Sequence, residues 1–415
     1  MASPSAQPRA KPPVGHQTGD WGTSIPWEDV AGQVAICGVG ESDHSKASGR
    51  SVREISAQAI ERALDDAGLE PGDVDGIMFS AGVGEQFGAE AYREHFGTSH
   101  EMWVSQRGGG MAWAATAPAR AARALRSGKA THIVNVFGVA WASQRGGEGG
   151  SHARFHKEEI FKASFEVPFG WFPQPVYFAT IARRHMHEFG TKPEDLGAIA
   201  VACRRHANLH PGAVMRDKTL SLEQYLARPP LVDPLRMEDC CLISDGGAAY
   251  IMTTPERARD LRKAPVHVVG VGEATSNTGL YWSQQPAFTS TPQIYAAPPA
   301  FEMAGISPRD VDVLALYDPF TIVALMQMED MGFCPKGEGG SFVEGDRLHF
   351  DGGGLAYNTH GGLLSHAYVL GISHVVELVR QLRGEAAAQV KNATVGVYGG
   401  YTGERASTLV LRRDA

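Results

Sequence analysis

Long hydrophobic runs are missing from this chain of 415 residues, and so is any long basic stretch. Without about 18 consecutive apolar residues, no segment has the composition of a membrane-spanning helix. The N-terminal segment contains Arg and Lys but no apolar core, so the pattern of a secretory signal is missing as well. A net charge of −8 with no basic stripe argues against a nucleic-acid surface. We therefore expect a cytoplasmic protein that binds neither membranes nor nucleic acids.

Cysteine is scarce in this chain, and its spacing matches no zinc-binding pattern. An odd number of cysteines in a long chain favours reduced thiols, buried as small apolar side chains, over a disulfide framework. We therefore expect no bound metal. The five cysteines are Cys37, Cys203, Cys240, Cys241 and Cys334.

The first half of the chain begins with a segment of low complexity and continues with strand and helix patterns. Residues 1–30 are rich in Pro, Gly, Ser and Ala, which predicts a flexible arm. An apolar run over 33–38 predicts a buried strand. Ser-Val-Arg-Glu at 51–54 is a capping-box pattern that predicts a helix through Ala67. A turn follows, and 76–80 predicts the next strand.

The same patterns return in the second half. Val-Val-Gly-Val-Gly-Glu at 268–273 resembles Ile-Cys-Gly-Val-Gly-Glu at 36–41. The turn at 304–312 likewise repeats the turn at 67–75, and a Leu-Arg motif precedes a late strand in both halves. Three similarities in the same order indicate two fused copies of one strand–helix–strand unit. Because each apolar strand needs cover on both faces, we predict a layered α/β architecture.

These repeats divide the chain into an arm and two halves. We assign 1–30 to the arm, 31–265 to an N-terminal half and 266–415 to a C-terminal half. A long insert at about 140–235 contains a Gly-rich loop, an aromatic stretch and a helix with Arg183. It either shapes the mouth of a substrate site or forms a solvated lid without a chemical role.

Four motifs carry a resemblance to the thiolase superfamily, and within it to the sterol-carrier and lipid-transfer-protein branch. The resemblance covers about 33–413 and implies the thiolase fold, with duplicated αβαβα halves and a lid insertion. The motifs are Ser-Asp-Gly-Gly-Ala-Ala at 244–249, Tyr-Asp-Pro-Phe-Thr at 317–321, Gly-Phe-Cys at 332–334 with Gly337 and Glu338, and Asn-Thr-His-Gly-Gly-Leu-Leu-Ser at 358–365.

Both cysteines that a thiolase uses are missing. A thiolase has a nucleophilic cysteine at the start of a helix in its first half, and here the matching segment is 104–113, without cysteine. No cysteine lies between Cys37 and Cys203. The second thiolase cysteine should precede the Gly-Gly loop at 397–401, yet none follows Cys334. The sequence therefore does not support ordinary thiolysis.

Two tyrosines stand where the sterol-carrier branch has catalytic histidines. Tyr317 replaces the histidine of the His-Asp-Xaa-Phe motif, and Tyr368 replaces the histidine that follows the Gly-Gly stretch. This pattern is similar to that of the steroid side-chain-cleaving aldolases of the lipid-transfer-protein group, whose site uses such a tyrosine pair. The resemblance therefore implies a carbon–carbon lyase (a retro-aldolase) of steroid degradation and lipid metabolism.

Retro-aldol cleavage of a β-hydroxyacyl-CoA suits these residues because it needs no thiol. A base removes the β-hydroxyl proton, the Cα–Cβ bond breaks, and donors hold the thioester enolate until an acid protonates Cα. A free tyrosine has a pKa near 10, so a tyrosinate base at pH 7 costs about 4 kcal/mol. Either a neighbour lowers that pKa or the tyrosine relays a proton. Candidate neighbours are His360 and His366, which could equally be structural, and Asp318 is a candidate positioning residue.

Glycine and arginine residues supply further candidates. Gly399, in the Gly-Gly pair after the last repeat strand, could offer an amide to an oxyanion. Phosphates of coenzyme A need basic side chains, and Arg107, Arg145 and Arg183 are candidates. We expect no permanently bound cofactor, with coenzyme A entering as part of the substrate.

Two other functions remain open alongside the lyase. One is a thiolase-like acyltransferase with an atypical nucleophile, for which an essential cysteine would be the signature. The other is a non-catalytic homologue that binds acyl-CoA. The resemblance further implies a homodimer, and a small OB-fold/zinc-ribbon partner protein that completes a heterotetramer.

Overall fold

The computed structural model describes residues 21–80, 86–144, 162–277 and 285–414, and its strands form one mixed sheet. Ten of its strands follow the order β4-β3-β5-β6-β2-β7-β11-β10-β8-β9, and β1 pairs with β7 outside this path. The strands are β1 (Gly22–Ile25), β2 (Ala35–Glu41), β3 (Gly76–Met78), β4 (Trp103–Ser105), β5 (Ile133–Ala140), β6 (Asp245–Thr253), β7 (Val266–Ser276), β8 (Val313–Leu316), β9 (Ala356–Tyr357), β10 (Val395–Tyr401) and β11 (Arg405–Arg413).

The strand order repeats between the two halves of the chain. Read outward from the middle of the sheet, the first half runs β2-β6-β5-β3-β4 and the second β7-β11-β10-β8-β9. In both halves the last strand along the chain thus lies beside an early one: β6 beside β2, and β11 beside β7. The two halves meet where Ala35 and Ile36 of β2 pair with His267 and Val266 of β7. The predicted architecture, a duplicated α/β fold, is confirmed.

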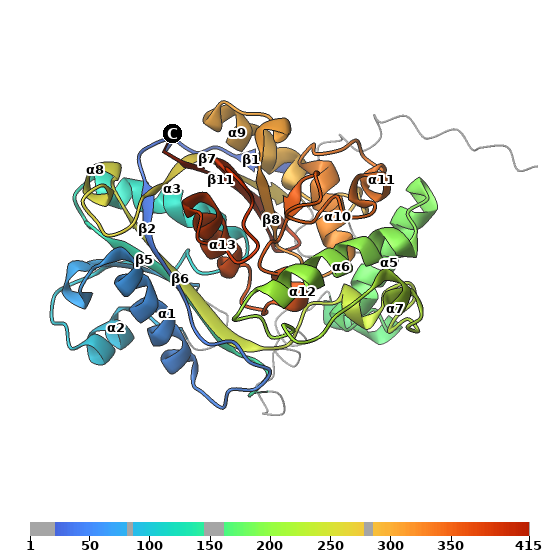
Figure 1. Ribbon diagram of the computed structural model, residues 1–415, viewed down its shortest axis with the longest axis horizontal. Coiled ribbons are helices and arrows are strands. Elements are labelled where there is room, and N and C mark those ends of the chain that lie inside the picture. The colour runs from blue at the N-terminus through green and yellow to red at the C-terminus, as the bar shows by residue number, and fades with distance from the viewer. Residues whose placement is uncertain (1–20, 81–85, 145–161, 278–284, 415) are drawn as a thin grey trace, which may run out of the picture.

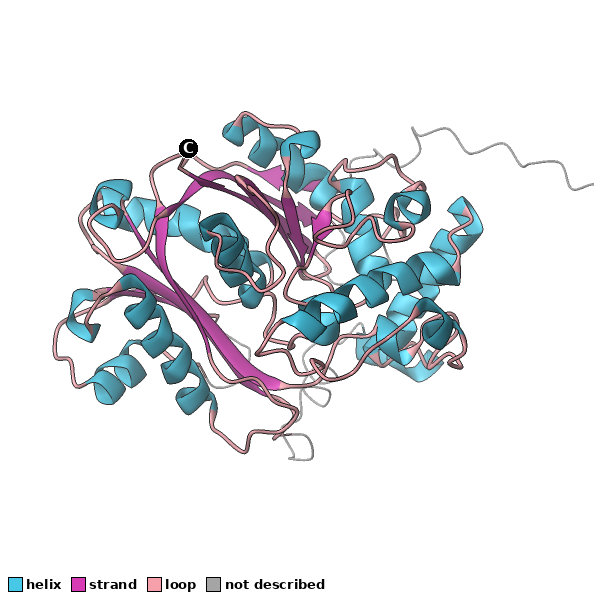
Figure 2. Ribbon diagram, viewed as in Figure 1, coloured by secondary structure: helices cyan, strands magenta, loops and turns pink. Residues whose placement is uncertain are grey.

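Helices cover the outer faces of the sheet and fill the space between its two halves (Figures 1 and 2). On the outside, α1 packs on β2, β5 and β6, whereas α9 packs on β7 and β11. Between the halves, α3 contacts β7, β10 and β11, and α13 contacts β2, β6 and β8. The helices are α1 (Val52–Ala67), α2 (Ala89–Phe96), α3 (Ala112–Arg126), α5 (Gln174–Phe189), α6 (Pro193–Leu209), α7 (Leu222–Leu226), α8 (Pro255–Ala258), α9 (Gln293–Ala304), α10 (Thr321–Asp330), α11 (Gly339–Val343), α12 (Gly362–Ser365) and α13 (Ile372–Arg383).

Local signals in the sequence explain where α1 begins and ends. The side chain of Ser51 accepts from the N–H of Glu54, and the Glu54 carboxylate accepts from the N–H of Ser51, so both halves of the predicted capping box form. Gly68 ends the helix in the left-handed conformation, at φ 72°. Along the helix, Ile55 and Ile60 are fully buried against the sheet. The sequence therefore accounts for the first residue of the helix, for the side of the helix that packs on the sheet, and for its end.

The end of the predicted N-terminal arm belongs to the folded sheet. The prediction extended the arm to residue 30, but β1 pairs antiparallel with the end of β7, from Gly22 opposite Ser276 to Ile25 opposite Glu273. Trp21 is buried, and its ring packs edge-on against Tyr295 at 5.3 Å between centroids. Short polar strands of this kind are recruited by a free sheet edge, which a composition-based prediction does not detect. The remaining arm, residues 1–20, lies outside the described residues.

The insert between the halves is largely helical where it is described. Helices α5, α6 and α7 belong to it, and α6 packs against α10, α11 and α12 of the second half. In Figure 1 these green helices lie beside the orange C-terminal segments. The Gly-rich loop of the insert, Ser-Gln-Arg-Gly-Gly-Glu-Gly-Gly at 143–150, lies mostly outside the described residues. None of the described helices has the length and apolar character needed to cross a membrane.

Candidate active site

The hydroxyl groups of Tyr317 and Tyr368 lie in direct contact inside the protein. Their Oη atoms are 3.0 Å apart, and either can be the donor. Tyr317 is 5% exposed and Tyr368 is 9% exposed, so the pair is shielded from bulk water. The fold thus brings together the two residues that the resemblance implies as a catalytic pair. Their chemical role remains a prediction.

Tyr317 is held by its own backbone at the end of β8. Its N–H donates to the carbonyl of Gly399 at 2.8 Å, which continues the pairing between β8 and β10. Its carbonyl accepts from Nε2 of Gln327, also at 2.8 Å. Since both main-chain groups are engaged, the ring leaves the sheet in a defined direction. Gln327, buried on α10, has a supporting role that the sequence did not reveal.

Tyr368 is held by residues from the other half of the molecule. Its N–H donates to Oγ of Ser244 at 2.8 Å. Its ring packs against that of Trp141 with 4.9 Å between centroids. Ser244 stands in the family motif at 244–249, but sequence reasoning gave it no role, because nothing local links it to a residue 124 positions away. Trp141 was missed because it follows β5 without a motif of its own.

Both phenols are kept neutral in the folded protein. Burial raises the pKa of Tyr317, and the neighbouring Tyr368 raises it further. Burial likewise raises the pKa of Tyr368, and the neighbouring Cys241 adds to the shift, although the hydrogen bond between the two tyrosines opposes it. A resting tyrosinate is therefore even less favourable than for a free tyrosine. Of the two roles left open by the sequence, this environment favours a proton relay between neutral hydroxyl groups.

Asp318 lies beside Tyr317 and ties together three segments. Its Oδ1 accepts from the N–H of Leu363 at 2.8 Å and contacts Nε2 of His374 at 3.1 Å, while Cys203 lies with its Sγ 3.8 Å from Oδ2. A Cβ added at Gly362 would lie only 2.1 Å from Oδ2, and that glycine has a φ of +62°. Only glycine allows this approach. These contacts suit the predicted positioning role, because the carboxylate holds the loop before Tyr368 against β8.

The Gly-Gly pair of β10 allows a close approach to the start of α3. A Cβ added at Gly400 would lie 2.7 Å from the carbonyl oxygen of Met111 and 2.8 Å from Cα of Ala112. Gly399 lies between β8 and β11, and its carbonyl is already engaged by Tyr317. The structure therefore shows a packing reason for glycine here. The use of the Gly399 amide by an oxyanion remains a prediction.

The start of α3, where a thiolase would have its nucleophile, packs against the tyrosine segment. Met111, the residue before α3, has a φ of +53°, and its N–H donates to the carbonyl of Leu370. Its carbonyl accepts from the hydroxyl of Tyr398 at 3.0 Å. Met111 therefore contacts Leu370, which follows Tyr368 by two residues. No cysteine lies in this segment.

None of the five cysteines has the environment of an activated nucleophile. Burial raises the pKa of Cys37, Cys240 and Cys334 to about 12. Burial also raises the pKa of Cys203 and Cys241 well above the ordinary value, and the carboxylate of Asp318 adds to both shifts. A nucleophilic cysteine needs a lowered pKa, since the thiolate is the reactive form. The acyltransferase alternative thus lacks the activated thiol that would have been its signature.

His360 and His366 belong to a different buried cluster. The ring of His360 lies 4.9 Å from that of His366 and 4.6 Å from that of His374. His366 in turn faces Glu41, with 3.7 Å between Nε2 and Oε1. Burial lowers the pKa of both histidines, so they are neutral. Their predicted help to Tyr368 remains a prediction, because the described contacts of both rings are with Glu41 and with other histidines.

The candidate ligands of coenzyme A are dispersed. Arg107 is exposed in the turn before α3, and Arg183 is exposed on α5, where it pairs with Asp233. Arg145 lies outside the described residues. The aromatic part of the insert does reach the site, because Phe178 of α5 stacks on Phe320 with 4.2 Å between ring centroids. The insert therefore contacts the segment that carries Tyr317, and its role as the mouth of a substrate site remains a prediction.

Glu377 of α13 makes stability depend on pH. Its Oε1 accepts from Oγ1 of Thr359 at 2.7 Å, and burial raises its pKa from an ordinary 4.5 to about 7. A carboxyl group with a raised folded-state pKa favours the fold at low pH, and this contribution is lost as pH rises from about 4.5 through about 7. We expect Glu377→Gln to stabilise the protein by about 1–3 kcal/mol at pH 8 and to change little at pH 4.5.

Urea denaturation at both pH values measures this difference. Glutamine keeps the acceptor for Thr359, so the variant removes only the ionisation. Equal destabilisation at both pH values would mean instead that glutamine has a structural cost unrelated to ionisation, and greater destabilisation at pH 8 would mean that the folded protein prefers the charged carboxylate.

Comparison with known proteins adds an independent line of evidence. The family model described as thiolase C-terminal domain-like matches residues 272–413. A steroid side-chain-cleaving aldolase from Thermomonospora curvata is 32% identical over 402 residues, which cover 93% of this chain and 99% of the relative. A 17-hydroxy-3-oxo-4-pregnene-20-carboxyl-CoA lyase from Mycobacterium tuberculosis is 34% identical over 391 residues, or 92% of this chain and 100% of the relative.

A solved structure agrees with these relatives. The protein described as Ltp2-ChsH2(DUF35) aldolase superimposes with a TM-score of 0.81 at 32% identity, covering 93% of this chain and 99% of that one. Similarity of this extent reaches both halves, the insert and the segments that carry Tyr317 and Tyr368.

Proposed function

Because the chain belongs to the thiolase superfamily, in its branch of acyl-CoA aldolases, we propose that it is a carbon–carbon lyase that cleaves a β-hydroxyacyl-CoA, namely the CoA ester of a steroid side chain. The products are a ketone and a shortened acyl-CoA of the propionyl-CoA type. The observation that carries this proposal is the buried pair of Tyr317 and Tyr368, with 3.0 Å between the hydroxyl oxygens. Coenzyme A is part of the substrate, and a cytoplasmic location belongs to the same proposal.

The tyrosine pair can move the one proton that the reaction transfers. Cleavage takes a proton from the β-hydroxyl group, and the electron pair of the Cα–Cβ bond moves into the thioester enolate. The β-carbon leaves as a ketone, and the enolate carbon then takes up a proton. Two phenols in contact can accept the first proton and return one to Cα, so that no net proton is exchanged with solvent. Neither water nor an oxidant is consumed.

A pair of neutral tyrosines suits this proton relay better than a tyrosinate that is already ionised in the resting protein. The buried phenols resist ionisation in the resting protein, so charge arises only while substrate occupies the site. Hydroxyl donors placed beforehand can then stabilise the enolate oxygen as its charge develops. Asp318 helps to position the pair without taking part in the proton transfer, because its carboxylate accepts from the N–H of Leu363 and contacts the ring of His374.

We further propose that the enzyme works as a homodimer with a small OB-fold/zinc-ribbon partner, which together form a heterotetramer. The related aldolase structure is named as a complex of two proteins, Ltp2 and ChsH2. The chain also exposes large apolar side chains on and after the insert, among them Phe169 at 81% and Met237 at 66%. A partner bound over these side chains would remove their apolar area from water.

The test is direct cleavage of a tertiary β-hydroxyacyl-CoA with a steroid ring system. The protein is incubated with this substrate, with and without the small partner, and the products are identified by mass spectrometry. We expect a ketone and an acyl-CoA shortened at the cleaved bond. If no cleavage occurs with the partner present, and the protein instead thiolyses a 3-oxoacyl-CoA with free coenzyme A, the lyase proposal is wrong.

A further inference from the structure

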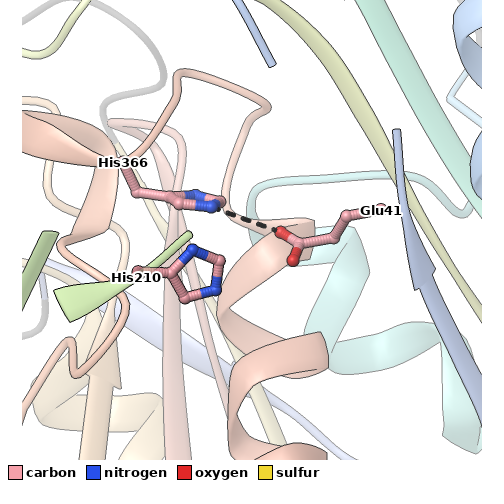
Figure 3. Close-up of side chains that lie close together, drawn as sticks. All are labelled: Glu41, His210 and His366. Carbon is pink, nitrogen blue, oxygen red and sulfur yellow. Dashed lines mark ion pairs between the residues drawn. The ribbon is translucent and has the colours of Figure 1, made fainter. Parts of the chain in front are cut away.

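A second cluster of polar side chains lies buried away from the tyrosine pair. It consists of Glu41, His210 and His366, whose potential ligand atoms all lie within 4.8 Å of one another. Figure 3 shows the two imidazole rings and the carboxylate turned toward a common centre. Glu41 and His210 are each 7% exposed, and His366 is fully buried. Neither the relay between the tyrosines nor the positioning of Asp318 uses these three groups.

Three distant segments supply the cluster. Glu41 is the last residue of β2, His210 ends α6 in the insert, and His366 ends α12 in the second half. The ring of His366 packs edge-on against that of His210, with 4.6 Å between centroids, and against that of His44, with 4.7 Å. The cluster therefore sits where the first half, the insert and the second half meet.

Several atoms of the cluster have unmet hydrogen-bonding capacity. Within the described part of the chain, Oε1 of Glu41 and both ring nitrogens of His366 are buried without a hydrogen-bond partner. Nε2 of His366 lies 3.7 Å from Oε1 of Glu41, too far for a hydrogen bond. Leaving a buried polar atom unpaired is unfavourable, so such groups call for a ligand. Here the unpaired atoms face one another across a gap.

The charge states of the three groups suit a cation. Burial alone would raise the pKa of Glu41, but the guanidinium group of Arg380 lowers it, so the carboxylate is ionised. Burial lowers the pKa of His210 to about 4 and that of His366 well below its ordinary value. Both imidazoles are therefore neutral and keep a free lone pair. An anionic carboxylate and neutral imidazoles are the forms that bind metal ions.

Glu41 is also oriented as a metal-binding carboxylate would be. Arg380 of α13 donates to its Oε2, which leaves Oε1 facing the histidines. Carboxylates that bind a metal through one oxygen commonly accept a hydrogen bond from a neighbouring side chain, which orients them. The position of Arg380 thus fixes which oxygen is presented.

A cleft provides a route to the cluster. It has a volume of about 700 Å³, and Glu41, His44, His210 and Arg380 are among its lining residues. An ion can therefore reach Glu41 and His210 from solvent, while His366 closes the inner side. Water from the cleft can take any coordination position that the protein leaves open.

We propose that Glu41, His210 and His366 bind a divalent transition-metal ion, with Zn²⁺ as the representative probe. Nitrogen and carboxylate ligands bind Zn²⁺ at about 2.0–2.2 Å, so side chains now up to 4.8 Å apart must close by roughly 1 Å. His210 must also release the N–H of Gly212, which donates to its Nδ1 at 3.2 Å. Coordination at either nitrogen ends that contact, because the other nitrogen then carries the proton.

The ion would brace the segment that leads to the tyrosine pair. His366 precedes Tyr368 by two residues, and Glu41 belongs to the opposite half of the sheet. A metal bond between them would tie the tyrosine segment to β2. This inference does not depend on the lyase reaction, because it concerns binding of an ion at a separate cluster.

Metal binding by the full-length chain alone, without its partner, tests the proposal. After treatment with a chelator and dialysis against Zn²⁺ buffered by a competing chelator, bound metal is measured by elemental mass spectrometry. We expect one ion per chain. Glu41→Gln, His210→Ala and His366→Ala each lose the ion or bind it at least ~100-fold more weakly. His187→Ala, at an exposed position on α5, is the matched control and retains it.

Two further readouts separate loss of the site from loss of the fold. Circular dichroism identifies any variant that does not fold. Of the three variants, we expect His210→Ala to disturb folding least, because His210 lines the cleft. Added Co²⁺ should give the visible absorption of a nitrogen- and oxygen-ligated ion in the parent protein and in His187→Ala, but not in the three cluster variants. The proposal is overturned if the folded parent binds no stoichiometric ion, or if the three variants bind as the parent does.

Discussion

Replacing Tyr368 with Phe should lower the rate of carbon–carbon cleavage by about 10²–10⁴-fold while the protein stays folded. The substitution removes one hydroxyl group and leaves the ring, so the contact with Trp141 and the backbone bond to Ser244 are kept. What is lost is one member of the hydroxyl pair, which otherwise lies 3.0 Å from Tyr317. Single-turnover formation of ketone from the steroid acyl-CoA, measured with the partner present, gives the effect on the chemical step.

Tyr317→Phe should have a similar effect, and the double variant sharpens the test. Groups that act as one unit are not additive, so the double variant should be about as slow as either single one. Tyr92→Phe is the matched control, since its buried hydroxyl donates to the carbonyl of Pro71, far from the pair. Full activity in Tyr317→Phe, or equal losses in Tyr92→Phe, would remove the tyrosine pair from the mechanism.

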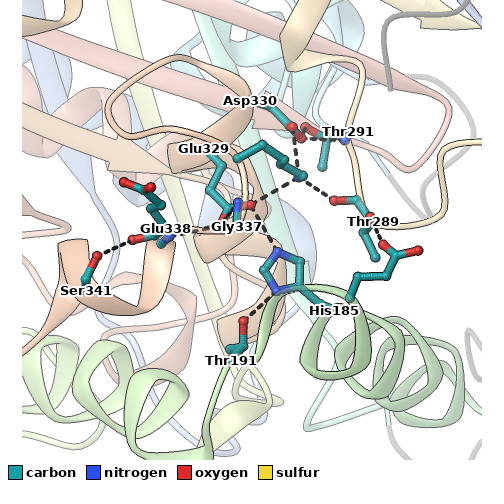
Figure 4. A network of polar contacts seen from close by, with 12 residues as sticks. His185, Thr191, Thr289, Thr291, Glu329, Asp330, Gly337, Glu338 and Ser341 are labelled. Carbon is teal, nitrogen blue, oxygen red and sulfur yellow. Dashed lines mark hydrogen bonds and ion pairs between the residues drawn. The ribbon is translucent and has the colours of Figure 1, made fainter. Parts of the chain in front are cut away.

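Loss of the Lys336 ammonium group should destabilise the protein by about 3–5 kcal/mol. Lys336 lies with its Nζ 3.2 Å from the carboxylate of Glu329 and 3.0 Å from that of Asp330. Both carboxylates are at most 1% exposed, and Nε2 of His185 lies 3.0 Å from Glu329 (Figure 4). Burial alone would lower the pKa of Lys336, but the two carboxylates raise it, so the lysine stays charged.

The variant Lys336→Met leaves two adjacent buried carboxyl groups without their cation. Removing one partner of a buried ion pair is costly because the remaining charge cannot be solvated. Adding Asp330→Asn should recover part of the loss, since one buried charge then disappears. Urea denaturation measures both, with Lys129→Met at an exposed position as the control. A change below about 1 kcal/mol in Lys336→Met would show that water or a rearrangement replaces the ammonium group.

Local patterns account for much of the fold. The helix α1 has the predicted cap at Ser51 and the predicted end at Gly68, because both depend on residues within one turn. The strand β1 was not predicted, since its pairing with β7 depends on residues about 250 positions away. The same distinction applies to the supporting residues of the site. Ser244 and Gln327 contact the two tyrosines only through the assembled fold.

The cluster of Glu41, His210 and His366 could not be predicted from the sequence. No spacing rule links residues 41, 210 and 366, so the expectation of no metal rested on local patterns alone. The tertiary structure brings the three together because β2, α6 and α12 meet where the two halves and the insert join. His366 was proposed as a neighbour of Tyr368 from its position in the chain, whereas its ring turns toward Glu41.

The sequence by itself determined the duplicated α/β architecture and the loss of the thiolase nucleophile. Repeated patterns are local, and folding cannot supply a cysteine that the relevant segment lacks. Only the tertiary structure decided that the hydroxyls of Tyr317 and Tyr368 touch and that both phenols stay neutral. Contact between residues far apart in the chain depends on how the complete sheet and its central helices pack, and burial, which sets the pKa, exists only after that packing.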